Sequence, residues 1–132
     1  MGVFRFKRFN VVNERSAMKV NTDGVLLGAS MTIRPSDRHL LDVGTGTGTI
    51  ALMAAQRLSD LICRPQPIDG DVSRPEGVSI TAIDIDEASA SEAAENFRNS
   101  DWAGMLSAKN ITLDAYSATL APEKRFDHIF SN

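Results

Sequence analysis

Hydrophobic residues along the chain fall into short runs and one helical stripe, and the two patterns alternate. Residues 39–44, HLLDVG, form a short apolar run ended by a glycine, which predicts a buried strand. Residues 49–58 place their apolar side chains on one face of a helix. A second strand is expected at 78–84. A second helix is expected at 86–100, with acids in its first turns, where the helix dipole favours negative charge.

Two further strands are expected, at 110–117 followed by a turn and at 126–132. Strands that alternate with helices are typical of a parallel sheet with right-handed crossovers and helices on its faces. The expected fold class is therefore α/β. Residues 59–77 contain three of the five prolines and show no periodicity, which indicates a long loop between the first helix and the second strand.

The first thirty residues predict a β-hairpin and a short helix. Apolar and basic residues alternate at the start of 3–12, as in a half-buried strand, and 16–20 would return the chain as its partner. Residues 22–30 predict a short helix with Thr22 or Asp23 as its N-cap.

Composition narrows the class of protein. A chain of 132 residues with a net charge of −3 is the size of one soluble globular domain. Cys63 is the only cysteine, which excludes an intramolecular disulfide and a multi-cysteine metal site, so no metal is expected. The N-terminus has no apolar segment like that of a secretory signal, and no apolar run approaches the roughly 20 residues that span a bilayer. We expect a cytoplasmic protein with no membrane partner.

A glycine-rich turn joins the first buried strand to the first helix, with Gly44, Gly46 and Gly48 at alternate positions. Glycines there permit positive φ and let a ligand lie against bare backbone, and the helix N-terminus offers free N–H groups. The pattern that ends at Ala51 also satisfies the dinucleotide-binding fingerprint. A P-loop is excluded, because no Gly-Lys-Ser/Thr follows. A tight turn with no ligand is the simplest alternative.

Two aspartates favour one kind of ligand. Asp42 lies two residues before the first glycine. Its carboxylate would repel a phosphate but would suit a ligand that carries an ammonium and a sulfonium. Asp84 ends the next strand, where it can accept hydrogen bonds from both hydroxyls of a ribose. It could instead cap the following helix, although Asp86 is better placed as that cap.

The glycine turn and the two aspartates together resemble the cofactor site of Rossmann-like S-adenosylmethionine-dependent methyltransferases. The resemblance implies that cofactor, with the loop against its methionine part and the acid of the second strand on its ribose. Many such enzymes carry an acid after the third strand, where this chain has Ser117, and Asp114 is placed inside that strand. The cofactor-binding residues that the resemblance implies are Asp42, Gly44, Thr45, Gly46, Gly48, Asp84, Ile85 and Ser117.

The N-terminal segment of the chain narrows the resemblance to one family of methyltransferases. It is similar to the N-terminal segment of bacterial tRNA adenine-N6 methyltransferases, which modify the adenine beside the anticodon of valine tRNA. The similarity continues through the glycine turn to the last strand and omits only residues 59–77. The matching front motifs are Met18-Lys19-Val20, Thr22-Asp23-Gly24 and Leu26-Leu27-Gly28-Ala29.

That family continues from the fourth strand with Asn-Pro-Pro-Tyr, and Asn132 aligns with its asparagine. The resemblance implies that Asn132 is catalytic, because its side chain would accept a hydrogen bond from an adenine amine whose lone pair is delocalised. Enzymes that methylate an rRNA base or a glutamine amide share the signature, and only the front motif favours tRNA. An NAD-binding oxidoreductase and a non-catalytic binding module stay as alternatives from other classes.

The resemblance also implies more strands than the four expected here, and a Pro-Pro-Tyr after Asn132. We therefore expect an active parent protein, of which the 132-residue chain is an inactive, aggregation-prone fragment with an exposed sheet edge. The chain would be a single domain, with 1–30 as a hairpin and helix extension and 39–132 as the cofactor-binding half of the core.

Basic residues are concentrated at the front of the chain, whereas 84–101 contain six acids and one arginine. A basic hairpin on an acidic protein would suit the phosphate backbone of RNA. The alternative is a solvated face of an amphipathic hairpin. Trp102, His39 and His128 are expected to be structural. The candidate substrate-binding residues are Arg5, Lys7, Arg8 and Lys19.

Overall fold

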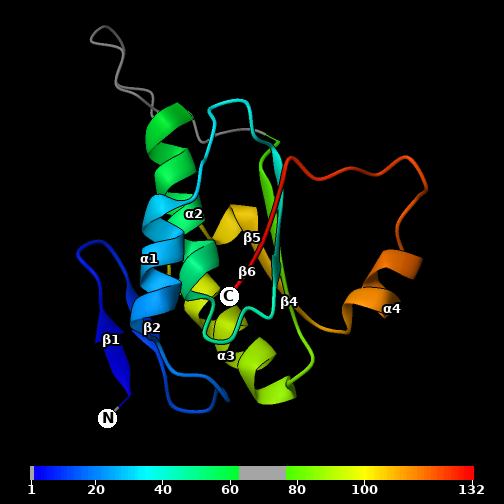
Figure 1. Cartoon of the computed structure of the whole chain (residues 1–132). Helices are drawn as coiled ribbons and strands as arrows, with labels where there is room; N and C mark the ends of the chain where they lie inside the picture. Colours follow the sequence, from blue (N-terminus) through cyan, green and yellow to red (C-terminus); the bar gives the residue numbers. More distant parts are fainter. Residues whose placement is uncertain (1, 63–76) are drawn as a thin grey trace, which may run out of the picture.

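The computed structural model describes residues 2–62 and 77–132. Figure 1 shows a central sheet with helices on both sides and a small hairpin at the N-terminal end. The predicted loop at 59–77 lies largely outside the described residues. Its first four positions instead extend a helix, because the apolar stripe continues to Leu61 and Ile62, which pack against the core.

The central sheet has four parallel strands in the order β5-β4-β3-β6, which confirms the predicted α/β class and parallel sheet. Their bounds are β3, His39–Val43, β4, Ser79–Asp84, β5, Leu106–Asn110, and β6, His128–Ser131. The chain runs outward from β3 through β4 to β5 and then returns to the other side of β3. This reversal leaves a crevice at the carboxyl ends of β3 and β6, which is where open α/β sheets bind ligands.

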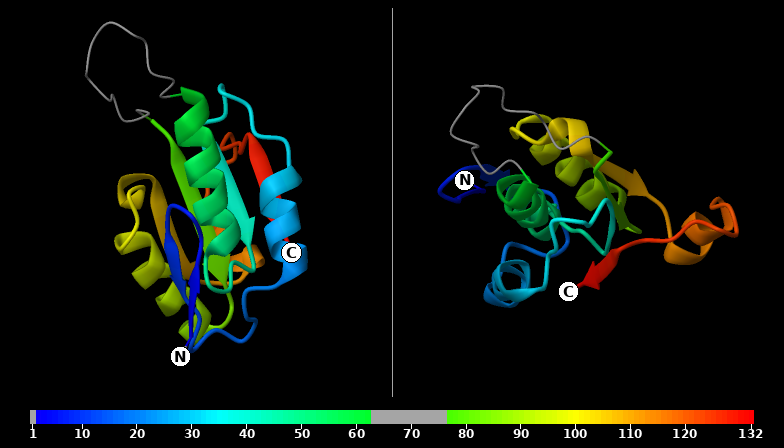
Figure 2. Two further views of the ribbon diagram at one scale, coloured as in Figure 1. Left: turned by 90° about the vertical axis from the view of Figure 1, so that its left-hand side faces the viewer. Right: turned by 90° about the horizontal axis from the view of Figure 1, so that it is seen from above.

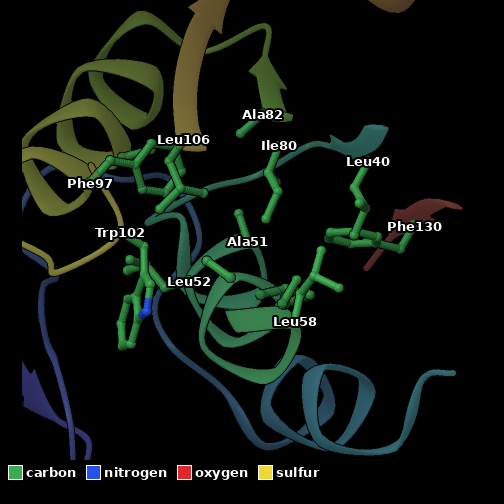
Figure 3. Close-up of a cluster of buried hydrophobic side chains, with 14 of the residues drawn as sticks. Leu40, Ala51, Leu52, Leu58, Ile80, Ala82, Phe97, Trp102, Leu106 and Phe130 are labelled. Atoms are coloured by element: carbon green, nitrogen blue, oxygen red, sulfur yellow. The ribbon is translucent and has the colours of Figure 1, made fainter. Parts of the chain in front are cut away.

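Helices α2, Thr49–Ile62, and α3, Glu87–Arg98, cover one face of the sheet, and the short α4, Leu113–Ala118, lies on the other face (Figure 2). Leu40 and Ile80 pair across the sheet and point into the main core with α2. Figure 3 shows this cluster, where Leu52 and Leu58 of α2 are fully buried. The next residue, Leu41, points to the opposite face, where it packs with Tyr116 of α4. The alternation of a pleated strand therefore supplies both cores.

The N-terminal hairpin is shorter than the pattern predicted. β1, Val3–Arg5, pairs antiparallel with β2, Asn10–Val12, so both strands lie inside the stretch predicted as one strand. Phe6 causes the difference, because its N–H donates to the carbonyl of Phe9 at 2.9 Å and the two rings stack. The predicted return strand at 16–20 is wrong.

Helix α1, Thr22–Ser30, forms where it was predicted, but its N-cap is Asn21 rather than Thr22 or Asp23. The side-chain oxygen of Asn21 accepts from the N–H of Gly24 at 2.8 Å. The predicted cap of α3 is confirmed, since Asp86 accepts from the N–H of Ser89 at 3.0 Å.

The third strand was predicted too late in the chain. Residues 106–110 form β5, and most of the predicted strand at 110–117 is helix α4. Thr112 begins that helix by accepting from the N–H of Ala115 at 3.1 Å. Asp114 therefore lies in the first turn of α4 and not inside a strand. A hydrogen-bonding N-cap and an acid in the first turn favour a helix over the weak alternation of this stretch.

Candidate functional site

A cavity of about 260 Å³ opens at the carboxyl ends of β3, β4 and β6. Its walls come from parts of the chain that are far apart in sequence. Two of these were predicted, the glycine turn with Asp84 and the end of the chain at Asn132. A further wall, residues 17–21, was not predicted to lie there, and α1 and α3 add Gly24, Val25 and Ser89. Figure 1 shows the turn after β3 and the end of β6 side by side at this edge of the sheet.

The glycine turn exposes backbone to the cavity at Gly44 and Gly46, which have φ values of 73° and 57°. Among the described residues, no atom lies within 4 Å of a Cβ added at Gly44. At Gly46 the nearest atom is the carbonyl oxygen of Met18, at 3.7 Å. A ligand can therefore approach the bare backbone here, in a slot that Met18 closes from the other side.

Gly48 has a different role from the one predicted. It does not line the cavity, and its φ is 85°. An added Cβ would lie 2.6 Å from the ring of Phe97 and 3.3 Å from Ala93. The glycine is required because α2 begins in close contact with α3.

Asp84 lies at the mouth of the turn and lines the cavity. One carboxylate oxygen accepts from the N–H of Gly46 at 2.8 Å, and the other accepts from the N–H of Asp86 at 2.9 Å. A carboxylate has about four acceptor positions, so two stay available to a ligand. Asp84 thus connects the glycine turn to the start of α3, but it is not the N-cap of that helix.

Asp42 lies beneath the glycine turn instead of in the cavity. Its side chain is 1% exposed. One oxygen accepts from the Thr45 hydroxyl at 2.8 Å, and the other has no hydrogen-bond partner within the described part of the chain. Burial, with a contribution from the charge of Asp84, raises the pKa of Asp42 to about 7, although the Thr45 hydroxyl opposes the shift. The structure thus places Asp42 where it supports the turn from below, and it adds a negative potential there only above its raised pKa.

Two other predicted cofactor residues lie outside the cavity. Ser117 is on α4, and its hydroxyl donates to the carbonyl of Asp114 at 3.0 Å. Ile85 follows Asp84 and is 76% exposed. Asn110, which the sequence did not single out, fastens this corner, because its side-chain amide donates to the carbonyls of Asp84 and Ile85 at 3.0 and 3.1 Å.

Asn132 borders the cavity at the end of β6. The Ser131 hydroxyl donates to the carbonyl of Val43 at 2.8 Å, which ties the end of β6 to β3. A Cβ added at Gly24 of α1 would lie 3.2 Å from the amide nitrogen of Asn132. The glycine of the Thr-Asp-Gly motif therefore leaves room for Asn132, and this explains the motif in physical terms.

Residues 17–21 form the wall that the sequence interpretation missed. They have no regular secondary structure. The Met18-Lys19-Val20 motif, which carries part of the family resemblance, lies in this wall. Lys19, predicted to bind substrate, lines this wall, and its ammonium donates to the carbonyl of Asn13 at 2.8 Å.

The other predicted substrate-binding cations differ in their surroundings. Arg8 pairs with Asp60 of α2 at 2.7 Å and lies over the ring of Trp102, 5.6 Å from its centroid. Trp102 itself is buried, which confirms that it packs in the core. Arg5 and Lys7 are exposed on the hairpin. Arg5 and Lys7 are therefore accessible to solvent, whereas Arg8 is held against α2 and Trp102.

Within 2–62 and 77–132, no cluster of three His, Cys, Asp or Glu residues is arranged to bind a metal ion. In the same residues, no helix is both long and apolar enough to span a membrane.

The fold is that of Rossmann-like methyltransferases. A putative O-methyltransferase from Klebsiella pneumoniae superposes with a TM-score of 0.63 at 17% identity, over 88% of this chain and 46% of that one. The O-methyltransferase from Bacillus cereus, solved with SAH, superposes with a TM-score of 0.57 at 17% identity, over 89% of this chain and 47% of that one. At these identities the likeness concerns the fold alone.

Comparison of the sequence with curated proteins points to a narrower class of methyltransferase than the fold does. Proteins named tRNA1(Val) (adenine(37)-N6)-methyltransferase align over 98% of this chain, at 38% identity in Christiangramia forsetii and 41% in Bacteroides thetaiotaomicron. The resemblance found in the sequence is thereby confirmed. The chain covers 47% and 46% of those two relatives, so it spans about half of their length. No protein-family model matches the chain.

Proposed function

We propose that this chain carries the cofactor site of an S-adenosylmethionine-dependent methyltransferase that methylates the N6 amine of an adenine in tRNA, beside the anticodon. The observation that carries the proposal is the meeting of the glycine turn, Asp84 and Asn132 around one cavity. In this proposal residues 39–132 are the cofactor-binding half of the core, and 1–30 are an extension that completes the cavity. A tRNA acceptor also favours a cytoplasmic location.

The residues present fit that cofactor. Asp84 has two free acceptor positions for the hydroxyls of a ribose. Gly44 and Gly46 offer bare backbone to the cavity, with open space beside Gly44 for a chain of the methionine type. Asp42 lies below the turn as an anion when ionised, which favours a cationic ligand over a phosphate. Above the raised pKa of Asp42, about 7, this preference distinguishes the site from a dinucleotide site.

The chain's own contribution to the reaction is binding and orientation. The cofactor, when bound, supplies a methyl group on a positively charged sulfur. Asn132 would accept a hydrogen bond from the N–H of the acceptor amine and so fix its nitrogen toward the cavity. The amine loses one proton to solvent as its nitrogen gains the methyl group. Positioning of the two reactants is the main catalytic effect in such a displacement.

The tRNA acceptor is supported by the names of the relatives, which are tRNA adenine-N6 methyltransferases. The exposed cations Arg5 and Lys7 lie on the N-terminal hairpin. Lys19 lines the cavity itself. In this proposal these side chains contact the phosphate backbone of the RNA, and Arg8 stabilises the hairpin by its contacts with Asp60 and Trp102.

The test is transfer of a labelled methyl group from S-adenosylmethionine by the intact protein. The substrates are an unmodified valine tRNA transcript and a matched transcript with guanine in place of the adenine at position 37. We expect label in the first RNA and none in the second, with N6-methyladenosine as the product after digestion. Label in both RNAs, in a protein glutamine or in rRNA alone would refute the proposed acceptor. Saturable binding of NAD without binding of S-adenosylhomocysteine would refute the proposed cofactor.

A further inference from the structure

Helix α3 presents three polar side chains on the face that meets the N-terminal extension. Ser89, Glu92 and Asn96 are spaced three and four residues apart, which places them along one stripe of the helix. All three are at most 1% exposed. Buried polar side chains in a helix need partners, and each of these three finds them in residues 12–17.

Glu92 makes the densest of these contacts. Its carboxylate accepts from the consecutive backbone N–H groups of Glu14, Arg15 and Ser16 at 3.0, 2.8 and 3.2 Å, and from the Ser16 hydroxyl at 2.8 Å. The positive guanidinium nitrogen Nε of Arg15 is 3.9 Å away. A buried carboxylate with four donors is stable only while the segment keeps this conformation, since loss of the contacts would leave a charge unpaired.

Asn96 and Ser89 make further hydrogen bonds to the same segment, before and after the residues that contact Glu92. The side chain of Asn96 accepts from the N–H of Val12 at 2.7 Å and donates to its carbonyl at 3.0 Å, as a neighbouring strand would. The hydroxyl of Ser89 accepts from the N–H of Ala17 at 3.2 Å. The next residues along the chain, 18–21, are the wall of the cavity, and the carbonyl of Met18 faces Gly46.

We propose that Glu92 is a positioning residue for the cavity: through its hydrogen bonds to residues 14–16 it fixes the wall formed by 17–21 against the glycine turn. Its carboxylate does not itself line the cavity. This inference rests on the proposed function only for the identity of the ligand. Without the hydrogen bonds to Glu92, residues 17–21 would lie against the glycine turn for a smaller fraction of the time. The apparent dissociation constant of the ligand would then equal the intrinsic one divided by that fraction.

The experiment compares Glu92→Gln with Glu95→Gln in the intact protein. Glu95 is on the same helix and also contacts Arg15, at 2.6 Å, but through the side chain on the surface. Amide hydrogen exchange of residues 13–20 is measured without ligand, and the affinity for S-adenosylhomocysteine is measured by calorimetry. Thermal unfolding of both variants reports global stability.

We expect Glu92→Gln to speed exchange at 13–20, to leave exchange in β3 and β4 unchanged, and to weaken binding by about tenfold. Glu95→Gln should change the affinity by less than about twofold. Unchanged exchange at 13–20 in Glu92→Gln would overturn the inference. So would wild-type affinity despite faster exchange, because the wall would then be irrelevant to binding.

A milder variant covers the case in which Glu92→Gln does not fold. Ser16→Ala removes only the hydroxyl that donates to Glu92. It should change exchange at 13–20 and the affinity in the same direction as Glu92→Gln but by less. If neither quantity changes, the inference is contradicted. If the wild-type protein fails to bind S-adenosylhomocysteine, the proposed cofactor is wrong, while the exchange measurement still decides whether Glu92 fixes residues 13–20.

Discussion

The side-chain amide of Asn96 donates a hydrogen bond to the carbonyl of Thr47 at 2.8 Å. The same amide bonds the carbonyl of Val12 in the hairpin. One buried side chain on α3 therefore connects the glycine turn to the N-terminal extension, although the three residues come from separate parts of the sequence. Asn96 thus holds Thr47, which lines the cavity, and the strand β2 that leads toward the wall at 17–21.

Asn96→Asp tests this connection. The variant keeps an acceptor for the N–H of Val12 but loses both donors, and it brings a carboxyl group close to two buried carbonyl oxygens. We expect the free energy of unfolding to fall by about 2–4 kcal/mol. Urea denaturation measures the loss. Asn99→Asp, at the exposed C-cap of the same helix, is the control and should cost less than about 1 kcal/mol.

Gly48→Ala tests the packing explanation of the third glycine. The added Cβ would meet the ring of Phe97 at 2.6 Å, in a backbone with φ of 85°. Both effects oppose the substitution, and we expect a loss of about 2–4 kcal/mol in the free energy of unfolding. Gly104→Ala is the matched control, because no atom of the described part of the chain lies within 4 Å of its Cβ and its φ is not positive. Equal losses in the two variants would refute the explanation.

Asp42 should make stability depend on pH. Burial raises its folded-state pKa to about 7 from the ordinary value of 3.8. Between these two values the folded protein binds a proton that the unfolded chain has released. The contribution of Asp42 to the free energy of unfolding therefore decreases as pH rises from about 4 to about 7, and is constant above that.

Asp42→Asn removes this titration. The stability of the variant minus that of the wild type should increase across the same pH window, as measured by urea denaturation at intervals from pH 4 to pH 8. The difference isolates Asp42 from other carboxylates such as Glu92. For Glu92 burial acts to raise the pKa, but the N–H groups of Arg15 and Glu14 and the Ser16 hydroxyl outweigh it and lower the pKa. A flat difference would contradict the raised pKa of Asp42.

The exposed cations of the hairpin should contribute to RNA affinity. Replacing Arg5 and Lys7 together by alanine should weaken tRNA binding and reduce the dependence of log K on log salt concentration by roughly one per lost phosphate contact. Filter binding across a salt series measures both. Lys109→Ala, on the edge strand β5, is the control and should leave the slope unchanged. A double variant with the wild-type slope would exclude this hairpin from the RNA interface.

Much of the fold follows from local patterns in the sequence. The apolar runs before Val43 and Asp84 mark two buried strands, and Asp86 marks a helix start, because these signals depend on neighbouring residues. The predicted boundary between β5 and α4 was wrong, because strand-like alternation and helix-capping residues overlap near Thr112. Tertiary packing decides between the two.

The site was predictable only in part. Gly44, Gly46 and Asp84 follow from the rule that parallel strands present their chemistry at their carboxyl ends, and Asn132 follows from the family resemblance. All four line the cavity. The wall at 17–21 was not predictable from local patterns, because it has no regular structure. Its conformation depends on Glu92, which is more than seventy residues away in the sequence. Such contacts leave no periodic signal.

The most direct test of the account is the affinity of the intact protein for S-adenosylhomocysteine with and without the carboxylate of Asp84. Asp84→Asn keeps an oxygen for the N–H of Gly46 but loses the charge and the paired acceptors proposed for the ribose. We expect the wild type to bind, Asp84→Asn to bind about 10–100-fold more weakly, and Asp114→Asn, which lies outside the cavity on α4, to bind like the wild type. Equal affinities of the wild type and Asp84→Asn, or no binding by the wild type, would contradict the account.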